Sequence, residues 1–536
     1  MRKISLKREQ ILFIALLLAG ILIRCIQFGS LPAGVNQDEA MGAVDAWALA
    51  RYGTDRFGVR LPVHFSAWQV SQMSVLLSYL MVPFLKVGGL STVAVRLPML
   101  LVSCGSLVLM YLVGKKLFST KMGLLFLALT AINPWHFMQS RWSLDCNLFP
   151  HVFLLAFYLL LLGLERQRFL YLSMVFFGLT FYCYGIAVYS VIPFLVVFAV
   201  WCLRKRQLKL HQIVWSVLIF GAVALPEILV MAINLFHWET IETPIFTMGR
   251  FPESVRGNDI LFLNFSLAQL GRNVWYLVSR VFLQVPDFVV NALPQFGPLY
   301  HISIPFMGIG IVTFTGKLFR EQDLASKTKD LALWVFWLTG VWVGIITYEV
   351  NVNRVNIIFY PLIMLCGYGI VWLVKCLQDR WKPLPQMTAA IYGSCAVLFL
   401  FCYFTDFREE SRTYYNEDFL EAVKTADQLE GYDTLYITGN MGWQFNRQMA
   451  EILTQYSCQI DALYYQEVTN LTGGRELAPY SERYHFVDMR TLDGQTPLLD
   501  DEVLFLVNQE DLEYLQFPYQ ILDSRGEFLT LVPAEE

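Results

Sequence analysis

Residues 11–28 read ILFIALLLAGILIRCIQF, an apolar run of the length that one membrane-spanning helix needs. The basic segment MRKISLKREQ precedes this run, and no small-residue cleavage site follows it. We therefore expect a membrane anchor rather than a removed signal peptide. The basic flank places the N-terminus in the cytoplasm.

The composition extends this prediction to most of the chain. Of 536 residues, 56% are hydrophobic and only 16% are charged, whereas soluble domains carry about 25% charged residues. These values exclude a disordered chain, a collagen-like fibre, a disulfide-dense secreted domain and an ordinary cytosolic enzyme. Ten further apolar runs make eleven predicted spans. They lie near 93–114, 121–139, 147–164, 169–185, 187–203, 212–235, 301–319, 331–348, 356–375 and 387–405.

The positions of basic residues agree with eleven spans. Clusters such as Lys115/Lys116, Arg204–Arg206 and Lys375–Lys382 all fall on the cytoplasmic side when the spans alternate. The segment 74–89 is interrupted by Pro83, and as a twelfth span it would invert every later basic loop. We assign it to a helix that lies in the outer interface.

The predicted fold is an all-α polytopic membrane protein with a small C-terminal α/β domain. Residues 1–405 form the transmembrane module, with a first outer loop at 30–92 and a large outer loop at 237–300. Residues 406–536 carry 26 acids against 8 Lys and Arg, which indicates a separate extracytoplasmic domain. Its predicted strands are at 434–439, 484–489 and 502–508, its helix is at 443–457, and a hairpin ends the chain.

The first outer loop carries a pair of acids, Asp38 and Glu39, at the start of an amphipathic stretch. Such a pair is commonly a solvated first-turn carboxylate that the helix dipole favours. An Asp held against the membrane surface can instead be desolvated into a general base. Both interpretations are open at this point.

The turn at 133–150 carries a second set of polar residues. Arg141 and Asp145 are four residues apart, so on one helix they would share a face. Alternatively, Asp145 caps the next span and Arg141 extends to lipid headgroups. We include His136 among the candidates, although such a histidine is more often packed.

The turn at 348–361 carries Glu349 and Arg354. The fork of an arginine binds phosphate oxygens in a bidentate manner, which lysine cannot do. An interfacial arginine that reaches toward the headgroups is the alternative. P-loop, HExxH, GxSxG and CxxC motifs are absent from the sequence.

The chain resembles the GT-C membrane glycosyltransferases, in particular the bacterial family related to protein O-mannosyltransferases and aminoarabinose transferases. The matching segments are GVNQDEA (34–40), VAVRLPMLL (93–101), SRWSLDCNLF (140–149) and NRVNIIFYPLIML (353–365). The chain departs from aminoarabinose transferases at QVSQMSVLL (69–77), where those relatives have Lys-Pro before the interface helix.

The resemblance implies roles for particular residues. Asp38 matches the catalytic base, Glu39 stands beside it, and Asp145 matches the acid of the second outer turn at the same site. Arg354 matches the residue that holds the lipid phosphate. The expected substrate-binding residues are Arg141, Arg354, His136, Glu349 and Arg96.

The expected activity is sugar transfer from a polyprenyl-phosphate donor to an acceptor on the outer face of the plasma membrane. The acceptor is a protein, a lipid or a wall polymer. No cofactor is required, and a divalent cation is compatible with the chemistry but not indicated; nucleic acid is not a partner. The alternatives are a non-enzymatic transporter of lipid-linked saccharides, with charges near mid-membrane, and an envelope-assembly scaffold.

Overall fold

The computed structural model describes residues 8–68, 71–251, 260–262, 265–463, 480–492 and 502–534. The basic flank at 1–7 lies outside the described residues. The chain forms two compact units. The helical unit comprises residues 1–28, 98–238 and 253–407, and the mixed unit comprises residues 29–97, 239–252 and 408–536.

The helical unit is a bundle in which every predicted span contains a helix. Its helices are α1 (Arg8–Cys25), α4 (Thr92–Leu117, which begins in the mixed unit), α5 (Thr120–Ala131), α6 (Pro134–Gln139), α7 (Asp145–Gly163), α8 (Gln167–Leu179), η1 (Thr180–Tyr182), α9 (Ala187–Arg204), α10 (Leu210–Phe236), α11 (Leu267–Leu277), η3 (Val278–Phe282), α12 (Ser303–Arg320), α13 (Leu324–Ile346), η4 (Asn356–Ile358), α14 (Phe359–Leu377) and α15 (Leu384–Thr405). Of these, α11 and η3 lie in the predicted outer loop 237–300.

Seven helices in the described part of the chain are long and apolar enough to cross a membrane. They are α4, α7, α9, α10, α13, α14 with η4, and α15. Helices α5 and α8, at two predicted spans, have 12 and 13 residues. The polytopic fold class is therefore confirmed, and the count of eleven spans stays a prediction.

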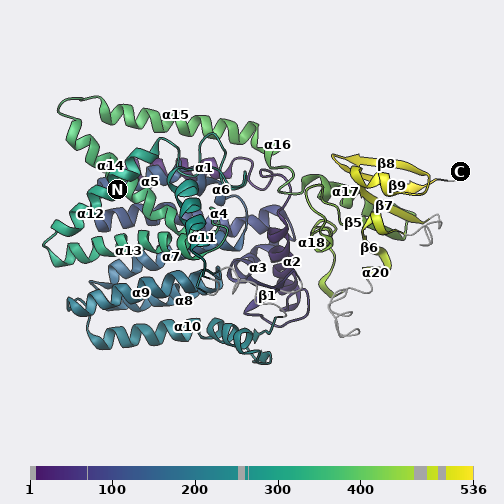
Figure 1. The fold of residues 1–536 in the computed structure, drawn as a ribbon, viewed down its shortest axis with the longest axis horizontal. Coiled ribbons are helices and arrows are strands. Elements are labelled where there is room, and N and C mark those ends of the chain that lie inside the picture. The colour runs from purple at the N-terminus through teal and green to yellow at the C-terminus, as the bar shows by residue number, and fades with distance from the viewer. Residues whose placement is uncertain are drawn as a thin grey trace, which may run out of the picture. The chain divides into compact units, whose positions relative to one another are not determined.

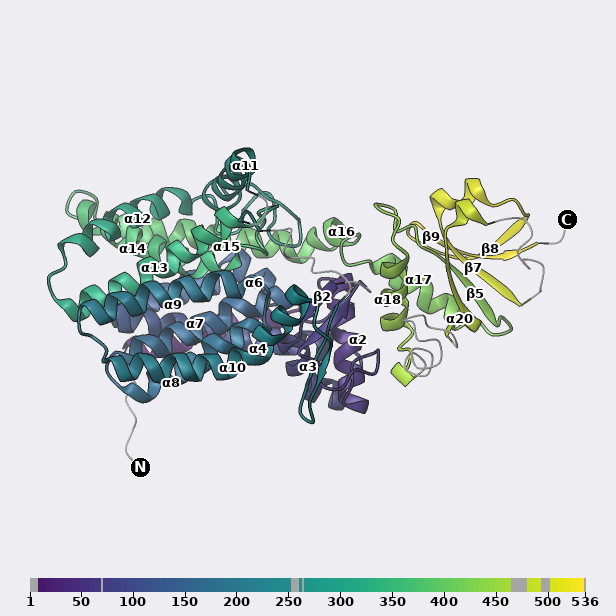
Figure 2. The same ribbon diagram turned by 60° about the horizontal axis from the view of Figure 1, so that its bottom comes forward.

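Small residues allow close packing inside the bundle. A Cβ atom on Gly310 of α12 would lie 1.9 Å from the Leu365 carbonyl oxygen, and one on Gly369 of α14 would lie 2.1 Å from the Phe306 oxygen. These two helices therefore touch backbone to backbone, as small residues permit in membrane bundles. Helices α7, α8, α9 and α10 run alongside one another in both views (Figure 1 and Figure 2).

Contacts within the helical unit join segments that the sequence predicts to lie on one side of the membrane. Glu165 pairs with Lys116 at 2.6 Å and with Lys329 at 3.3 Å, and all three belong to predicted cytoplasmic segments. In the predicted outer segments, the Val352 N–H donates to Asp287 at 2.6 Å. The alternation of the loops is thus consistent within this unit.

The C-terminal part of the mixed unit is an α/β domain, as predicted. Its elements are α16 (Phe407–Ser411, which begins in the helical unit), α17 (Glu417–Asp427), β5 (Thr434–Thr438), α18 (Arg447–Ser457), α20 (Tyr480–Arg483), β6 (Tyr484–Val487), η5 (Met489–Thr491), β7 (Val503–Asn508), η6 (Gln509–Tyr514), β8 (Tyr519–Arg525) and β9 (Phe528–Pro533).

The five strands are ordered β6-β5-β7-β9-β8. The first three are parallel, and β9 pairs antiparallel with both β7 and β8. All six residues of β7 are buried, because α17 and α18 cover one face of the sheet (Figure 1) while Met489 and Leu512 pack on the other. The central strand is therefore apolar from Val503 to Val507, as parallel strands covered on both faces are.

The N-terminal part of the mixed unit is the first predicted outer loop. Its elements are α2 (Gln37–Tyr52), the hairpin of β1 (His64–Ala67) and β2 (Ser71–Ser74), and α3 (Leu76–Gly88), which is the predicted interface helix; β3 (Ile241–Glu242) and β4 (Thr247–Met248) add a second hairpin. Helix α2 packs against α3 and against α18. The predicted outer loop and the C-terminal domain therefore form one compact unit.

Candidate functional site

Asp38 lies in the first turn of α2. Asn36 caps this helix, and its side-chain oxygen accepts a hydrogen bond from the Asp38 N–H at 3.0 Å. Asp38 is half-buried. The N-terminal end of a helix attracts negative charge, so an acidic residue suits this position.

Glu39, the neighbour of Asp38, is completely buried and forms a bidentate ion pair with Arg96 of α4. Both bonds of the pair, from Nε to Oε1 and from Nη2 to Oε2, are 2.9 Å long. Arg96 also donates to the carbonyl oxygens of Pro32 at 2.7 Å and Gly34 at 2.8 Å. Glu39 is thus not a solvated first-turn acid, and the pair fixes the start of α2 and the loop before it.

The loop before α2 is also bound to residues 414–416. The Val35 N–H donates to the Tyr415 carbonyl at 2.6 Å, and the Asn416 side chain donates to the Val35 carbonyl at 3.1 Å. The Asn36 side chain donates to the Tyr414 carbonyl at 3.3 Å. The backbone that leads to Asp38 is therefore held by segments that lie more than 370 residues away in the sequence.

Buried acids lie where α2 packs on α18. Asp45 pairs with Arg56, and both side chains are buried. Burial raises the pKa of Asp55 to about 7, and the charge of Asp45 adds to this effect. Burial also raises the pKa of Glu451 on α18 to about 7. These acids carry a proton more readily than an exposed carboxylate does.

Arg141 is completely buried, so it does not extend to lipid headgroups. Its guanidinium donates to the carbonyl oxygens of Arg24, Ile26 and Gln27 at 2.8–2.9 Å and to the Tyr403 hydroxyl at 3.2 Å. These carbonyls lie where α1 ends, a place that favours a cation. Arg141 therefore anchors the end of the first helix.

Asp145 is the first residue of α7 and is 8% exposed. Its Oδ1 accepts from the N–H of Cys146 at 2.6 Å. Arg141 lies in the turn between α6 and α7, so the two residues are not on one helix. The predicted functional coupling between Arg141 and Asp145 stays a prediction.

His136 is bound to an arginine that we did not select from the sequence. Its Nδ1 lies 2.8 Å from Nη2 of Arg24, and both side chains are completely buried. Arg24 also donates to the carbonyls of Gly20 at 2.8 Å and Ala131 at 2.9 Å. The signal in the sequence is an arginine in the last turn of an apolar span, since a buried intramembrane cation needs partners.

Arg354 and Glu349 lie between α13 and η4. Arg354 Nη2 lies 3.6 Å from Glu349 Oε2, a pair in which the Arg354 side chain is 21% exposed and that of Glu349 is 83% exposed. The Arg354 N–H donates to the Asn351 side chain at 2.9 Å. Arg354, one of the five predicted substrate-binding residues, thus has a partly accessible guanidinium and lies in a turn.

Amide side chains from three predicted outer segments meet in the helical unit. Gln139 donates to Asn291 at 3.3 Å and to Asn353 at 3.5 Å, and Asn356 donates to the Cys146 carbonyl at 2.6 Å. We call Gln139, Asn291 and Asn353 the amide cluster. Within the described residues, Gln139 Oε1 and Asn356 Oδ1 are buried without a hydrogen-bond partner. Buried polar atoms without a partner are rare in proteins.

Metal binding has no visible donor set in the part of the chain that the structure describes. No group of three or more His, Cys, Asp or Glu side chains there is placed to hold a metal ion.

Comparison with known proteins identifies the fold. Residues 72–231 match the family model described as dolichyl-phosphate-mannose-protein mannosyltransferase. The structure is similar to that of ArnT from Cupriavidus metallidurans in the apo state, with 11% identity, a TM-score of 0.55 and 97% of each chain covered. ArnT bound to undecaprenyl phosphate gives 12% identity, a TM-score of 0.54 and the same coverage.

A second relative is the Archaeoglobus fulgidus oligosaccharyltransferase in the apo form, with 10% identity and a TM-score of 0.51. This match covers 84% of the present chain and 64% of the oligosaccharyltransferase. No curated protein matches the sequence.

The chain is thus a multi-pass membrane protein with the GT-C glycosyltransferase fold. The predicted resemblance to enzymes related to protein O-mannosyltransferases and aminoarabinose transferases is confirmed.

Proposed function

We propose that this chain transfers a sugar from a polyprenyl-phosphate carrier to an acceptor hydroxyl, with Asp38 as the general base. The observation that carries the proposal is a half-buried carboxylate at the start of α2, held beside a completely buried ion pair, in a chain with the GT-C fold. ArnT from C. metallidurans, which has this fold, is known bound to undecaprenyl phosphate. That carrier is the model for the donor here.

The reaction is a single displacement at the anomeric carbon. The acceptor oxygen forms a bond to this carbon while the bond from the carbon to the phosphate oxygen breaks. The acceptor proton passes to Asp38, and the polyprenyl phosphate leaves with the electron pair of the broken bond. A positioned base and cations near the leaving phosphate are the groups that this step requires.

Glu39 and Arg96 act as positioning residues in this proposal. The two side chains neutralise each other's charge in the ion pair. Arg96 also binds two carbonyl oxygens of the loop before α2. Positioning of a base within a few tenths of an ångström is a large part of its catalytic worth. Arg141, whose donors go to carbonyls, has a corresponding structural role at the end of α1.

Arg354 is the residue that we assign to the donor phosphate. Its guanidinium is partly accessible, and its carboxylate partner Glu349 is mostly exposed at 3.6 Å, a weak pair that a phosphate can replace. The amide cluster includes Asn353 of the same turn, which accepts a hydrogen bond from Gln139 at 3.5 Å. Asn353 is half-buried, and its amide can donate to or accept from a sugar hydroxyl.

We place the reaction on the outer face of the plasma membrane, with the N-terminus inside and residues 406–536 outside. The support is that the basic loops fall on one side of the alternating spans. Protease treatment of intact cells or spheroplasts should release the acidic domain. Protection of that domain until lysis would contradict this orientation and the outer location of Asp38.

The test of the proposal is transfer by the purified full chain in lipid nanodiscs. Synthetic undecaprenyl-phosphate sugars serve as donors and a cell-envelope fraction as acceptor. Asp38→Asn keeps the size of the side chain but removes its basicity, so transfer should fall by about two to four orders of magnitude. Binding of the donor should persist.

Asp323→Asn is the matched control. Asp323 caps α13 in a predicted cytoplasmic segment and accepts from the Ser326 N–H at 2.9 Å, a bond that asparagine can keep. Its transfer rate should match the wild type. Wild-type turnover in Asp38→Asn would remove Asp38 from the mechanism, and absence of transfer from every donor would oppose the enzymatic function.

A further inference from the structure

A cavity of about 690 Å³ lies in the C-terminal domain, and none of the residues that line it belongs to the candidate functional site. Its lining comes from the segments that follow the three parallel strands: residues 440–445 after β5, Arg490 after β6 and residues 509–514 after β7. In open α/β sheets, ligands bind outside the carboxyl ends of the parallel strands. The cavity, which we call the edge pocket, has this location and the volume of a small-molecule site.

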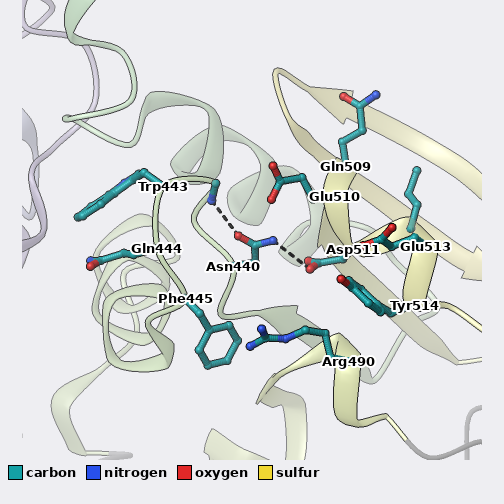
Figure 3. A pocket seen from close by; sticks show the side chains of 12 residues that line it. Asn440, Trp443, Gln444, Phe445, Arg490, Gln509, Glu510, Asp511, Glu513 and Tyr514 are labelled. Atoms are coloured by element: carbon teal, nitrogen blue, oxygen red, sulfur yellow. Dashed lines mark hydrogen bonds between the residues drawn. The ribbon is translucent and has the colours of Figure 1, made fainter.

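Flat aromatic and guanidinium faces form part of the edge pocket. Phe445 is 45% exposed and Tyr514 is 40% exposed. The Arg490 guanidinium lies 5.3 Å from the centre of the Phe445 ring, and Figure 3 shows it between Phe445 and Tyr514. Asp488 holds this guanidinium with two bonds of 2.7–2.8 Å. The pocket thus presents fixed planar surfaces to a ligand.

The polar lining is amide-rich and carries a net negative charge. Among the described residues of the lining, Glu510, Asp511 and Glu513 are the acids, and Arg490 is the arginine, which is paired with Asp488. Asn440 spans the cavity and donates to Asp511 at 3.1 Å (Figure 3). A phosphate or another anion would meet repulsion here.

A sugar matches both kinds of surface. Its hydroxyls donate to carboxylates and amide oxygens and accept from amide N–H groups. The C–H face of its ring is apolar and carries slight positive charge, which suits the negative face of an aromatic ring. A nucleotide or a phosphosugar also has a flat face that fits the aromatic rings, but the acids of the pocket would repel its negative phosphate.

We propose that the edge pocket binds a saccharide built of neutral or amino-substituted sugar units. Binding by the pocket is argued from its own lining and does not require Asp38. That the saccharide is part of the acceptor or of the product is a further step, which rests on the proposed function.

The experiment uses the full chain in nanodiscs on an array of immobilised oligosaccharides. The array carries hexose, N-acetylhexosamine, free-amino sugar and uronic acid oligomers, together with a lysine-rich peptide. The best oligosaccharide is then titrated by calorimetry against the wild type and variants. We expect retention of neutral or amino sugars in preference to uronic acids.

Two variants and two controls locate the site. Tyr514→Ala and Phe445→Ala should each weaken binding at least about tenfold, which corresponds to about 1.4 kcal/mol. Tyr519→Ala is the matched control, because Tyr519 is a similarly exposed tyrosine, at 36%, of the same domain that does not line the pocket. Asp38→Asn should bind the oligosaccharide as the wild type does, so that a failure of sugar transfer and a failure of sugar binding are distinguishable.

Three results would overturn the proposal. The first is that no oligosaccharide is retained at about 10 mM, a concentration that detects even weak sites. The second is preferential binding of uronic acids or of the peptide. The third is an unchanged affinity in Tyr514→Ala. Thermal unfolding of each variant shows that it is folded. Tyr514 lies on the exposed side of η6, so its truncation keeps the test interpretable if Phe445→Ala does not fold.

Discussion

The substitution Glu39→Gln should strongly destabilise the mixed unit. It keeps the shape of the side chain but leaves the Arg96 guanidinium buried without its counter-charge. Both side chains are 0% exposed, so water cannot replace the lost carboxylate. Removal of one partner from such a buried pair costs about 3–5 kcal/mol.

This loss of free energy should lower the thermal unfolding midpoint of the mixed unit by a measurable amount. A unit of 150–250 residues loses about 2–4 °C of midpoint per kcal/mol, so the mixed unit should unfold about 6–20 °C earlier. The probe is Cys458, the one cysteine in the mixed unit. Burial raises the pKa of its thiol, so alkylation of the folded state is slow and unfolding accelerates it.

The assay is pulsed alkylation of the purified chain over a temperature series, with Cys458 modification read by mass spectrometry. Arg51→Gln is the control, since the Arg51–Asp461 ion pair also involves α2 and lies in the same unit, but with side chains 44% and 26% exposed. Its loss should cost less than about 1 kcal/mol. A Glu39→Gln midpoint within about 2 °C of the wild type would refute the structural role of the buried pair.

Three further outcomes are expected. Arg354→Ala should weaken binding of an undecaprenyl-phosphate sugar, and Arg354→Lys should restore it only in part because an ammonium lacks the bidentate fork; equal affinity in all three proteins would exclude a phosphate contact. Arg141→Gln should lower the thermal midpoint of the helical unit without changing donor affinity, and a selective loss of affinity would instead make Arg141 a donor contact. Because burial holds the pKa of Glu451 at about 7, above its usual value near 4.3, the mixed unit should lose stability as pH rises from about 4 to about 7 and stay level above that. Arg447 and Arg56 oppose this shift, and Glu451→Gln should reduce the difference between midpoints measured at pH 5 and pH 8.

Local sequence patterns predict the elements of this protein well. The strands expected at 434–439, 484–489 and 502–508 are β5, β6 and β7, and the segment 74–89 contains α3. Apolar period and turn residues determine such elements over a few residues, so one sequence contains the required signal. Two predicted spans, in contrast, contain α-helices of only 12 and 13 residues, because a turn at 132–133 and the 3-10 helix η1 with the turn at 183–186 interrupt the apolar runs.

Partners of charged side chains are the part that local patterns do not predict. Arg24 and His136 are 112 residues apart, and Glu39 and Arg96 are 57 apart, so no periodicity links them. The sequence identifies Glu39, Arg96, Arg141 and His136 as candidate catalytic or substrate-binding residues. It could not show that their hydrogen-bonding capacity is used largely within the protein, since tertiary contacts decide that.

Two buried arginines, Arg96 and Arg141, lie in segments that resemble the GT-C family. Both bind backbone carbonyls in the stretch of chain that precedes Asp38. Arg141 holds the carbonyls of residues 24, 26 and 27 within the helical unit, and Arg96 holds those of residues 32 and 34 within the mixed unit. The segment 24–34 is therefore fixed near both of its ends by guanidinium groups. Arginine suits this task because its five donors serve several carbonyls at once, whereas the ammonium of lysine is a compact charge with three. A general base must be held in place to be effective, so arginines that touch no substrate can still be required for transfer.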